Sequence, residues 1–175
     1  MNDDIYEIFE KHLSILPRTD VDLFKVTKVC DNIYMSSYFV INSKLLKDYN
    51  IKVILNLSKY NYNFLVEEDI VIYKLDINDD ISTNVNKYFD KVNKIIHYYV
   101  KKNKNILIHC RAGINRSGVF IANYMMSTVD IKSTYQVYLV LFAIINLLIK
   151  NRGQFLENPS FRKQLLSYYI NKVNK

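Results

Sequence analysis

Apolar residues in this chain follow two kinds of pattern, short runs and longer stretches with helical spacing. The runs are typical of strands, and they predict strands over residues 32–39, 52–57, 70–75 and 105–109. Between the last two strands, apolar residues recur at helical spacing from residue 85 to residue 100. This spacing predicts an amphipathic helix that buries one face.

Similar periodicity predicts further helices over residues 2–16, 119–126 and 133–151, and a last one from about residue 158. Gly153 is expected to end the helix before it. Asn158 is expected to cap the last helix, with Pro159 in its first turn. Strands that alternate with helices predict an α/β layer fold, and the sequence has neither repeats nor an internal domain boundary.

Residues 137–149 have the composition of a membrane span, because the segment is apolar apart from Asn146. The segment is shorter than the roughly 20 residues that are needed to cross a bilayer. We therefore predict a buried core helix and no membrane span.

The length and the net charge limit the possible classes of protein but do not identify a function. The 175 residues are enough for one domain with a sizeable core. The net charge of +7 favours anionic partners, although the scattered lysines are also typical of a solvated surface.

The two cysteines do not make a disulfide framework, and acids occupy the start of the chain where a secretory signal would be positive. A reducing compartment with free thiols is expected.

The stretch with the clearest chemistry covers residues 108–118 and reads Ile-His-Cys-Arg-Ala-Gly-Ile-Asn-Arg-Ser-Gly. It joins a predicted strand to a predicted helix, so that loop amides and the helix N-terminus point at one place and form an anion site. Gly113 permits the tight backbone path, and Gly118 permits close packing after the turn.

Four side chains in this stretch have predicted chemical roles. Cys110 lies at the floor of the cradle, where the amides and the helix dipole favour the thiolate, the competent nucleophile. Arg116 follows six positions later, and its planar fork suits two phosphoryl oxygens. Ser117 is expected to hydrogen-bond the sulfur, and His109 to hold the shape of the loop.

The pattern His-Cys, five residues, Arg-Ser-Gly resembles the phosphate loop of the cysteine-based protein phosphatases. The short chain resembles their dual-specificity branch, which acts on phosphotyrosine and on phosphoserine or phosphothreonine. From about residue 26 to the C-terminus it is similar to the poxvirus H1-type enzymes, as judged from residues 32–34, 53–57, 87–90 and 157–161. The family's usual Tyr-Leu-Gly is replaced here by Tyr34-Met35-Ser36. The resemblance implies a single-domain cysteine-phosphatase fold, with a central, mostly parallel sheet flanked by helices.

The resemblance also implies a general acid on the loop formed by residues 76–80. Alignment with the family makes Asp79 this acid, whereas the residues alone leave Asp76 and Asp80 open as well. The acid would protonate the leaving oxygen and then, as a carboxylate, activate water. Asp80 is expected to orient the loop or to be solvated.

The predicted phosphate contacts come from the backbone of the loop and from its arginine. They involve Arg111, Ala112, Gly113, Ile114, Asn115 and Arg116. No metal and no cofactor is implied. Asn115 is expected to order the loop, and Arg152 and Asn158 to support it from behind.

Two other classes of function remain open on the sequence. One is a phosphoinositide or RNA 5′-phosphatase on the same fold; such relatives often carry Lys or His inside the loop and Thr after the arginine. Ile114, Asn115 and Ser117 favour protein substrates instead. The other is a non-catalytic phosphoprotein-binding module, against which the intact Cys110, Arg116 and Asp79 argue.

Analogy with the family suggests partners and location. It implies virion proteins and host signalling proteins as phosphorylated substrates, and the virion and host-cell cytoplasm as the location. Residues 1–20 are interpreted as an N-terminal helix that serves as a dimerisation arm, and residues 21–175 as the phosphatase domain. A homodimer is therefore expected, and a nucleic-acid partner is not.

Overall fold

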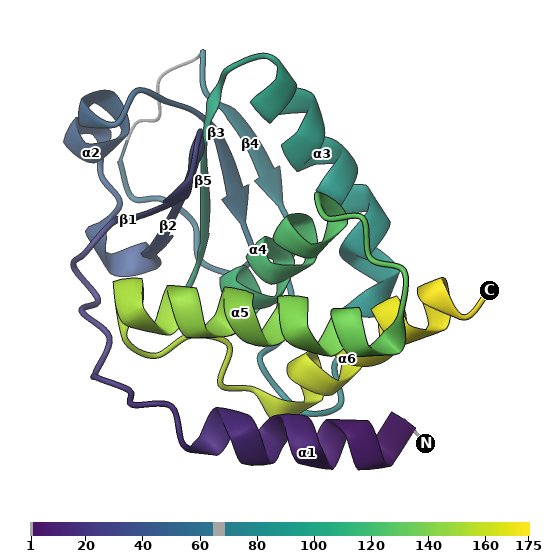
Figure 1. The fold of residues 1–175 in the computed structure, drawn as a ribbon. Helices are drawn as coiled ribbons and strands as arrows, with labels where there is room; N and C mark the ends of the chain where they lie inside the picture. The colour runs from purple at the N-terminus through teal and green to yellow at the C-terminus, as the bar shows by residue number, and fades with distance from the viewer. Residues whose placement is uncertain (1, 65–68) are drawn as a thin grey trace.

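A five-stranded sheet with the order β1-β2-β5-β3-β4 forms the centre of the fold (Figure 1). The structure is a computed structural model, and it describes residues 2–64 and 69–175. The strands are β1 (Thr27–Cys30), β2 (Ile33–Ser37), β3 (Ile51–Asn56), β4 (Val71–Lys74) and β5 (Asn105–Cys110). Only the pairing of β1 with β2 is antiparallel among the described strands, so the predicted mostly parallel sheet is confirmed.

The helices lie in two layers, one on each side of the sheet (Figure 1). The small layer is α2 (Ser43–Asp48). The large layer contains α1 (Asn2–Ser14), α3 (Phe89–Lys101), α4 (Arg116–Ser127), α5 (Thr134–Arg152) and α6 (Pro159–Val173). Two short 3₁₀ turns complete the fold, η1 (Tyr38–Val40) and η2 (Asn86–Tyr88). The predicted N-terminal helix and the α/β class are confirmed.

Strand β5 shows why the sequence builds this layer structure. Successive side chains of a strand point to opposite faces of the sheet. Ile106 and Ile108 belong to the main core beneath α3 and α4, whereas Leu107 belongs to the smaller core beneath α2. Because both faces are covered, the strand needs a continuous apolar run, which is the pattern that the sequence shows.

Helix α5 is the one helix in the described part of the chain that is long and apolar enough to cross a membrane by composition. One of its faces lies in the main core, with Val137, Leu141, Ile145 and Leu148 buried there. Its outer face keeps Leu139 and Leu147 exposed. The segment therefore packs as the core helix that its sequence predicts.

Three details differ from the sequence-based expectations. The predicted strand over 32–39 ends at Ser37, because the side chain of Ser37 accepts a hydrogen bond from the Phe39 amide and starts a 3₁₀ turn. Strand β1 has only four residues and carries too little pattern to be recognised. Helix α2, capped by Asn42, has only six residues, fewer than two turns of helical periodicity.

Candidate active site

The predicted nucleophile lies where the central strand β5 gives way to helix α4. Cys110 is the last residue of β5, and α4 begins at Arg116, so the loop between them sits at the carboxyl end of a parallel sheet. In such α/β sheets, ligands bind outside the carboxyl ends of the strands. The N-terminus of α4 adds its dipole to the same place, which favours an anion.

Two donors converge on the sulfur of Cys110. The backbone amide of Gly113 donates to Sγ at 3.3 Å, and the hydroxyl oxygen of Ser117 lies 3.4 Å from Sγ. The predicted contact between Ser117 and the sulfur is therefore present. Cys110 itself is buried at the base of the loop. Both contacts place polar groups at the sulfur on the side of the phosphate loop and helix α4.

The side chain of Arg116 has one N–H group that makes no hydrogen bond to the described residues. Its Nη1 donates to the carbonyl of Ile77 at 3.1 Å, and its Nε lies 3.6 Å from Oδ2 of Asp79. The Nε atom is buried and has no hydrogen-bond partner among the described residues. A buried donor without a partner is costly, so it is suited to an anionic ligand that completes it.

The structure distinguishes among the three acids of the upstream loop. Asp79 pairs with Arg116, and its Oδ1 accepts a hydrogen bond from Nδ2 of Asn158 at 3.1 Å. Asp80 instead accepts hydrogen bonds within its own loop, which lower the pKa of its carboxyl group. Asp76 is exposed and does not line the pocket over the phosphate loop.

That pocket has a volume of about 500 Å³. It brings the upstream acids together with the phosphate loop, and its lining includes Asp79, Asp80, Arg111, Ala112, Asn115 and Arg116. Arg111 is exposed at the rim, as expected from its position in the loop.

Arg152 supports the phosphate loop from behind, as the sequence predicts. Its Nε donates to the carbonyl of Gly113 at 2.7 Å, and its Nη2 donates to that of Ala112 at 3.3 Å. Gly113 has φ +67°, and a Cβ there would lie 2.4 Å from the carbonyl oxygen of Ser36 and from Nη2 of Arg152. The residue at position 113 must therefore be glycine.

A second support comes from the segment that joins α5 to α6. The side-chain oxygen of Asn115 accepts from the amides of Glu157 at 2.7 Å and Asn158 at 3.0 Å. The amide of Leu156 donates to the carbonyl of Ile114 at 3.1 Å. Leu156 adopts φ +52°, a conformation that costs a non-glycine residue about 1–3 kcal/mol. The sequence gives no signal for this strained contact, because leucine has no preference for positive φ.

The neighbours of His109 select one tautomer of its ring, and burial keeps the ring neutral. Its Nδ1 lies 3.4 Å from the carbonyl of Cys110, and its Nε2 lies 2.6 Å from the hydroxyl of Tyr62. A carbonyl can only accept, so Nδ1 carries the proton and Tyr62 donates to Nε2. Burial lowers the pKa of His109 to about 4, and the ring is neutral near pH 7. Tyr62 is a residue that the sequence analysis missed.

Protonation of His109 is expected to destabilise the protein in mild acid. The pKa of its side chain is about 4 when folded and 6.5 when unconstrained, so the unfolded state binds more protons between these values. The contribution of neutral His109 is present above pH 6.5 and is lost as the pH falls toward 4. Between pH 7 and pH 4.5, wild type should lose about 2–3 kcal/mol more than His109→Asn, measured by urea unfolding.

The matched control for this experiment is His97→Asn, because His97 is exposed on α3. This variant should keep the pH dependence of wild type. Equal losses of unfolding free energy for wild type and His109→Asn would show that His109 is not the group responsible.

Comparison with known proteins assigns the family. Residues 33–171 match the family model for the dual specificity phosphatase catalytic domain. The chain is 33% identical over 145 residues to the dual specificity protein phosphatase OPG106 of Vaccinia virus (strain Copenhagen), with 83% of this chain and 82% of the relative covered. It is 30% identical over 145 residues to a probable dual specificity protein phosphatase H1 homolog of Fowlpox virus, with 83% and 85% covered.

A solved structure shows the same fold. OH1 from the Orf virus, described as a tyrosine phosphatase with triple substrate specificity, superposes with a TM-score of 0.83 at 22% identity. The superposition covers 95% of this chain and 98% of that one.

The fold and the phosphate loop define a cysteine-based protein phosphatase. The chain belongs to the dual specificity phosphatase family, and its similarity to the poxvirus H1-type enzymes confirms the resemblance seen in the sequence. Membership of this family assigns to the chain the hydrolysis of phosphotyrosine and of phosphoserine or phosphothreonine in proteins.

Proposed function

We propose that this phosphatase works through a phosphocysteine intermediate on Cys110, with Arg116 as the phosphate ligand and Asp79 as the general acid. The observation that supports this most directly is the convergence of the Gly113 amide and the Ser117 hydroxyl on Sγ. The Nε of Arg116 makes no hydrogen bond within the described part of the chain and lies 3.6 Å from Oδ2 of Asp79, and the Arg116 side chain lines the same pocket.

In the first step the thiolate of Cys110 attacks phosphorus, and the S–P bond forms as the ester P–O bond breaks. The equatorial oxygens bind to Arg116 and to the amides of residues 111–116, which stabilise the developing charge. Asp79 transfers its proton to the leaving oxygen, since expulsion of an alkoxide from serine or threonine is costly.

In the second step the carboxylate of Asp79 takes a proton from water, and the water oxygen attacks phosphorus. The S–P bond breaks, and the electron pair returns to sulfur as inorganic phosphate leaves. The hydroxyl of Ser117, 3.4 Å from Sγ, stabilises the departing thiolate by a hydrogen bond.

Asp79→Asn tests the acid role, because the amide cannot supply the proton. We expect kcat/KM on a phosphothreonine peptide to fall by about 10²–10⁴-fold. On 4-nitrophenyl phosphate, whose leaving group needs no proton, the first step should persist while hydrolysis slows. The variant should then release a burst of one equivalent of nitrophenol per active site, measured by stopped-flow absorbance.

Asp76→Asn is the matched control, since Asp76 belongs to the same loop but does not line the pocket over the phosphate loop. It should change kcat/KM on either substrate by no more than about twofold. Equal losses for Asp79→Asn on the two substrates would contradict the assignment of the acid.

The proposed substrates are phosphorylated virion proteins and host signalling proteins, and the proposed location is the virion and the host-cell cytoplasm. The support is the similarity to poxvirus phosphatases. Fractionation of purified virus particles with an antibody against the chain would test the location, and a complete lack of signal in the particles would contradict it.

We also propose that residues 1–20 form a dimerisation arm on a phosphatase domain of residues 21–175. Helix α1 lies against α5 and α6 of its own chain and leaves Ile8 52% exposed, and Ile15, directly after the helix, is 77% exposed. These apolar side chains support contact with a second copy. Light scattering that gave a monomer mass at all protein concentrations would contradict the dimer.

A further inference from the structure

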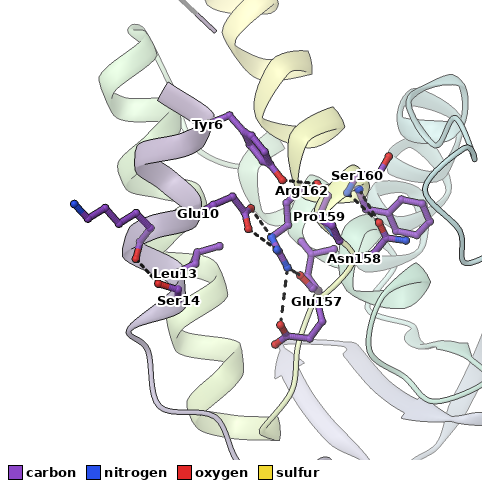
Figure 2. A network of polar contacts seen from close by, with 12 residues as sticks. Tyr6, Glu10, Leu13, Ser14, Glu157, Asn158, Pro159, Ser160 and Arg162 are labelled. Atoms are coloured by element: carbon purple, nitrogen blue, oxygen red, sulfur yellow. Dashed lines mark hydrogen bonds and ion pairs between the residues drawn. The ribbon is translucent and has the colours of Figure 1, made fainter. Parts of the chain in front are cut away.

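An ion pair between Glu10 and Arg162 joins helix α1 to helix α6 (Figure 2). Arg162 donates from Nε to Oε1 of Glu10 at 2.7 Å and from Nη2 to Oε2 at 2.5 Å. The side chains of Arg162 and Glu10 are only 9% and 26% exposed. A two-point pair of this kind, largely shielded from water, fixes both position and orientation.

The third guanidinium nitrogen of Arg162, Nη1, contacts Leu156, the non-glycine residue with positive φ in the segment between α5 and α6. Its Nη1 donates to the carbonyl of Leu156 at 2.8 Å, while the amide of Leu156 donates to Ile114 in the phosphate loop. The guanidinium therefore holds the one non-glycine residue of this segment that has a positive φ. With Glu10 bound on its other side, Arg162 has little freedom to leave that carbonyl.

A second contact ties the end of α1 to the same segment. Arg18 donates from Nε to Glu157 at 2.8 Å and from Nη1 to the carbonyl of Leu13 at 2.8 Å. Glu157 also lies 3.9 Å from Nη1 of Arg162, as Figure 2 shows. Residues 156 and 157 are thus held from the α1 side by two arginines.

On the side away from α1, residues 157 and 158 contact the phosphate loop and the loop of residues 76–80. The amides of Glu157 and Asn158 donate to Asn115 of the phosphate loop, and Nδ2 of Asn158 donates to Asp79. The phosphate loop is also held from behind by Arg152, so a displacement of the segment would move Asp79, through Asn158, relative to that loop.

We propose that Glu10, acting through Arg162, is a positioning residue for the acid Asp79. Helix α1 then serves as a clamp that holds residues 156–158 against the catalytic loops. The proposal rests on the proposed role of Asp79. A residue that only stabilised the fold would affect all substrates equally, whereas a displaced acid matters only when the leaving oxygen needs a proton.

The test compares two substrates in the full-length chain. Glu10→Ala should lower kcat/KM on a phosphothreonine peptide by about tenfold, because the acid is displaced but still present. On 4-nitrophenyl phosphate the loss should stay within about twofold. Glu10→Gln keeps the shape and one neutral hydrogen bond, so its loss on the peptide should be smaller, about threefold.

Glu7→Ala is the matched control, since Glu7 is an exposed acid on the same helix. It should leave both rates within about twofold of wild type. Thermal melting of each variant reports whether it is folded; if Glu10→Ala does not fold, the comparison is made on Glu10→Gln.

Equal losses on the two substrates, or no loss on either, would overturn the positioning role if Asp79→Asn still discriminates between them. If Asp79→Asn itself does not discriminate, the acid assignment fails, and the positioning role fails with it.

Discussion

Cys110→Ser is expected to abolish phosphate release from every phosphopeptide, with kcat lowered by about 10⁵-fold or more. The serine hydroxyl keeps nearly the same size, but it is not ionised in this setting and cannot attack phosphorus effectively. Arg116 and the backbone amides of residues 111–116 remain in place, so the variant should still bind phosphopeptide. Phosphate release and peptide binding by calorimetry measure the two effects separately.

The other cysteine provides the control. Cys30 lies at the end of β1, is half-buried, and lines a different pocket together with Tyr124 and Ile144. Cys30→Ser should retain the activity of wild type. An inactive Cys30→Ser, or a Cys110→Ser variant that retained turnover, would contradict the assignment of the nucleophile.

Arg116→Lys is expected to lower kcat by about 10³-fold, although the charge is conserved. Lysine cannot offer two parallel N–H groups to two phosphoryl oxygens, and the hydrogen bond from Nη1 to Ile77 is lost as well. Because the arginine binds the transition state more strongly than the ground state, KM should change much less than kcat.

Steady-state kinetics with a phosphotyrosine peptide, together with inhibition by inorganic vanadate, measure the effect of this substitution. Vanadate affinity should fall along with kcat, since the trigonal-bipyramidal anion needs the same planar donor. Unchanged kcat in a folded Arg116→Lys protein would remove Arg116 from the phosphate site.

The phosphate loop could be predicted from the sequence because its chemistry is local. Cys110, Gly113, Arg116 and Ser117 lie within one strand–loop–helix unit, and the structure places the Gly113 amide and the Ser117 hydroxyl at the sulfur of Cys110. The parallel sheet followed in the same way from apolar runs that alternate with amphipathic helices.

Contacts between distant parts of the chain could not be predicted in this way. The pairing of Glu10 with Arg162 spans 152 residues, and the hydrogen bond from Tyr62 to His109 spans 47. Glu10, Arg162 and Tyr62 lie in no motif that predicts these contacts. The acid was an intermediate case: the residues alone left three candidates, and the pairing of Asp79 with Arg116 now supports the choice made by family resemblance.

The central claim is a metal-independent phosphatase of dual specificity, and wild-type phosphate release tests it most directly. The measurement uses a phosphotyrosine peptide and a phosphothreonine peptide, with reductant to keep the thiol free and a chelator to remove metal ions. We predict release from both peptides. No release from either peptide by the folded protein would contradict the claim.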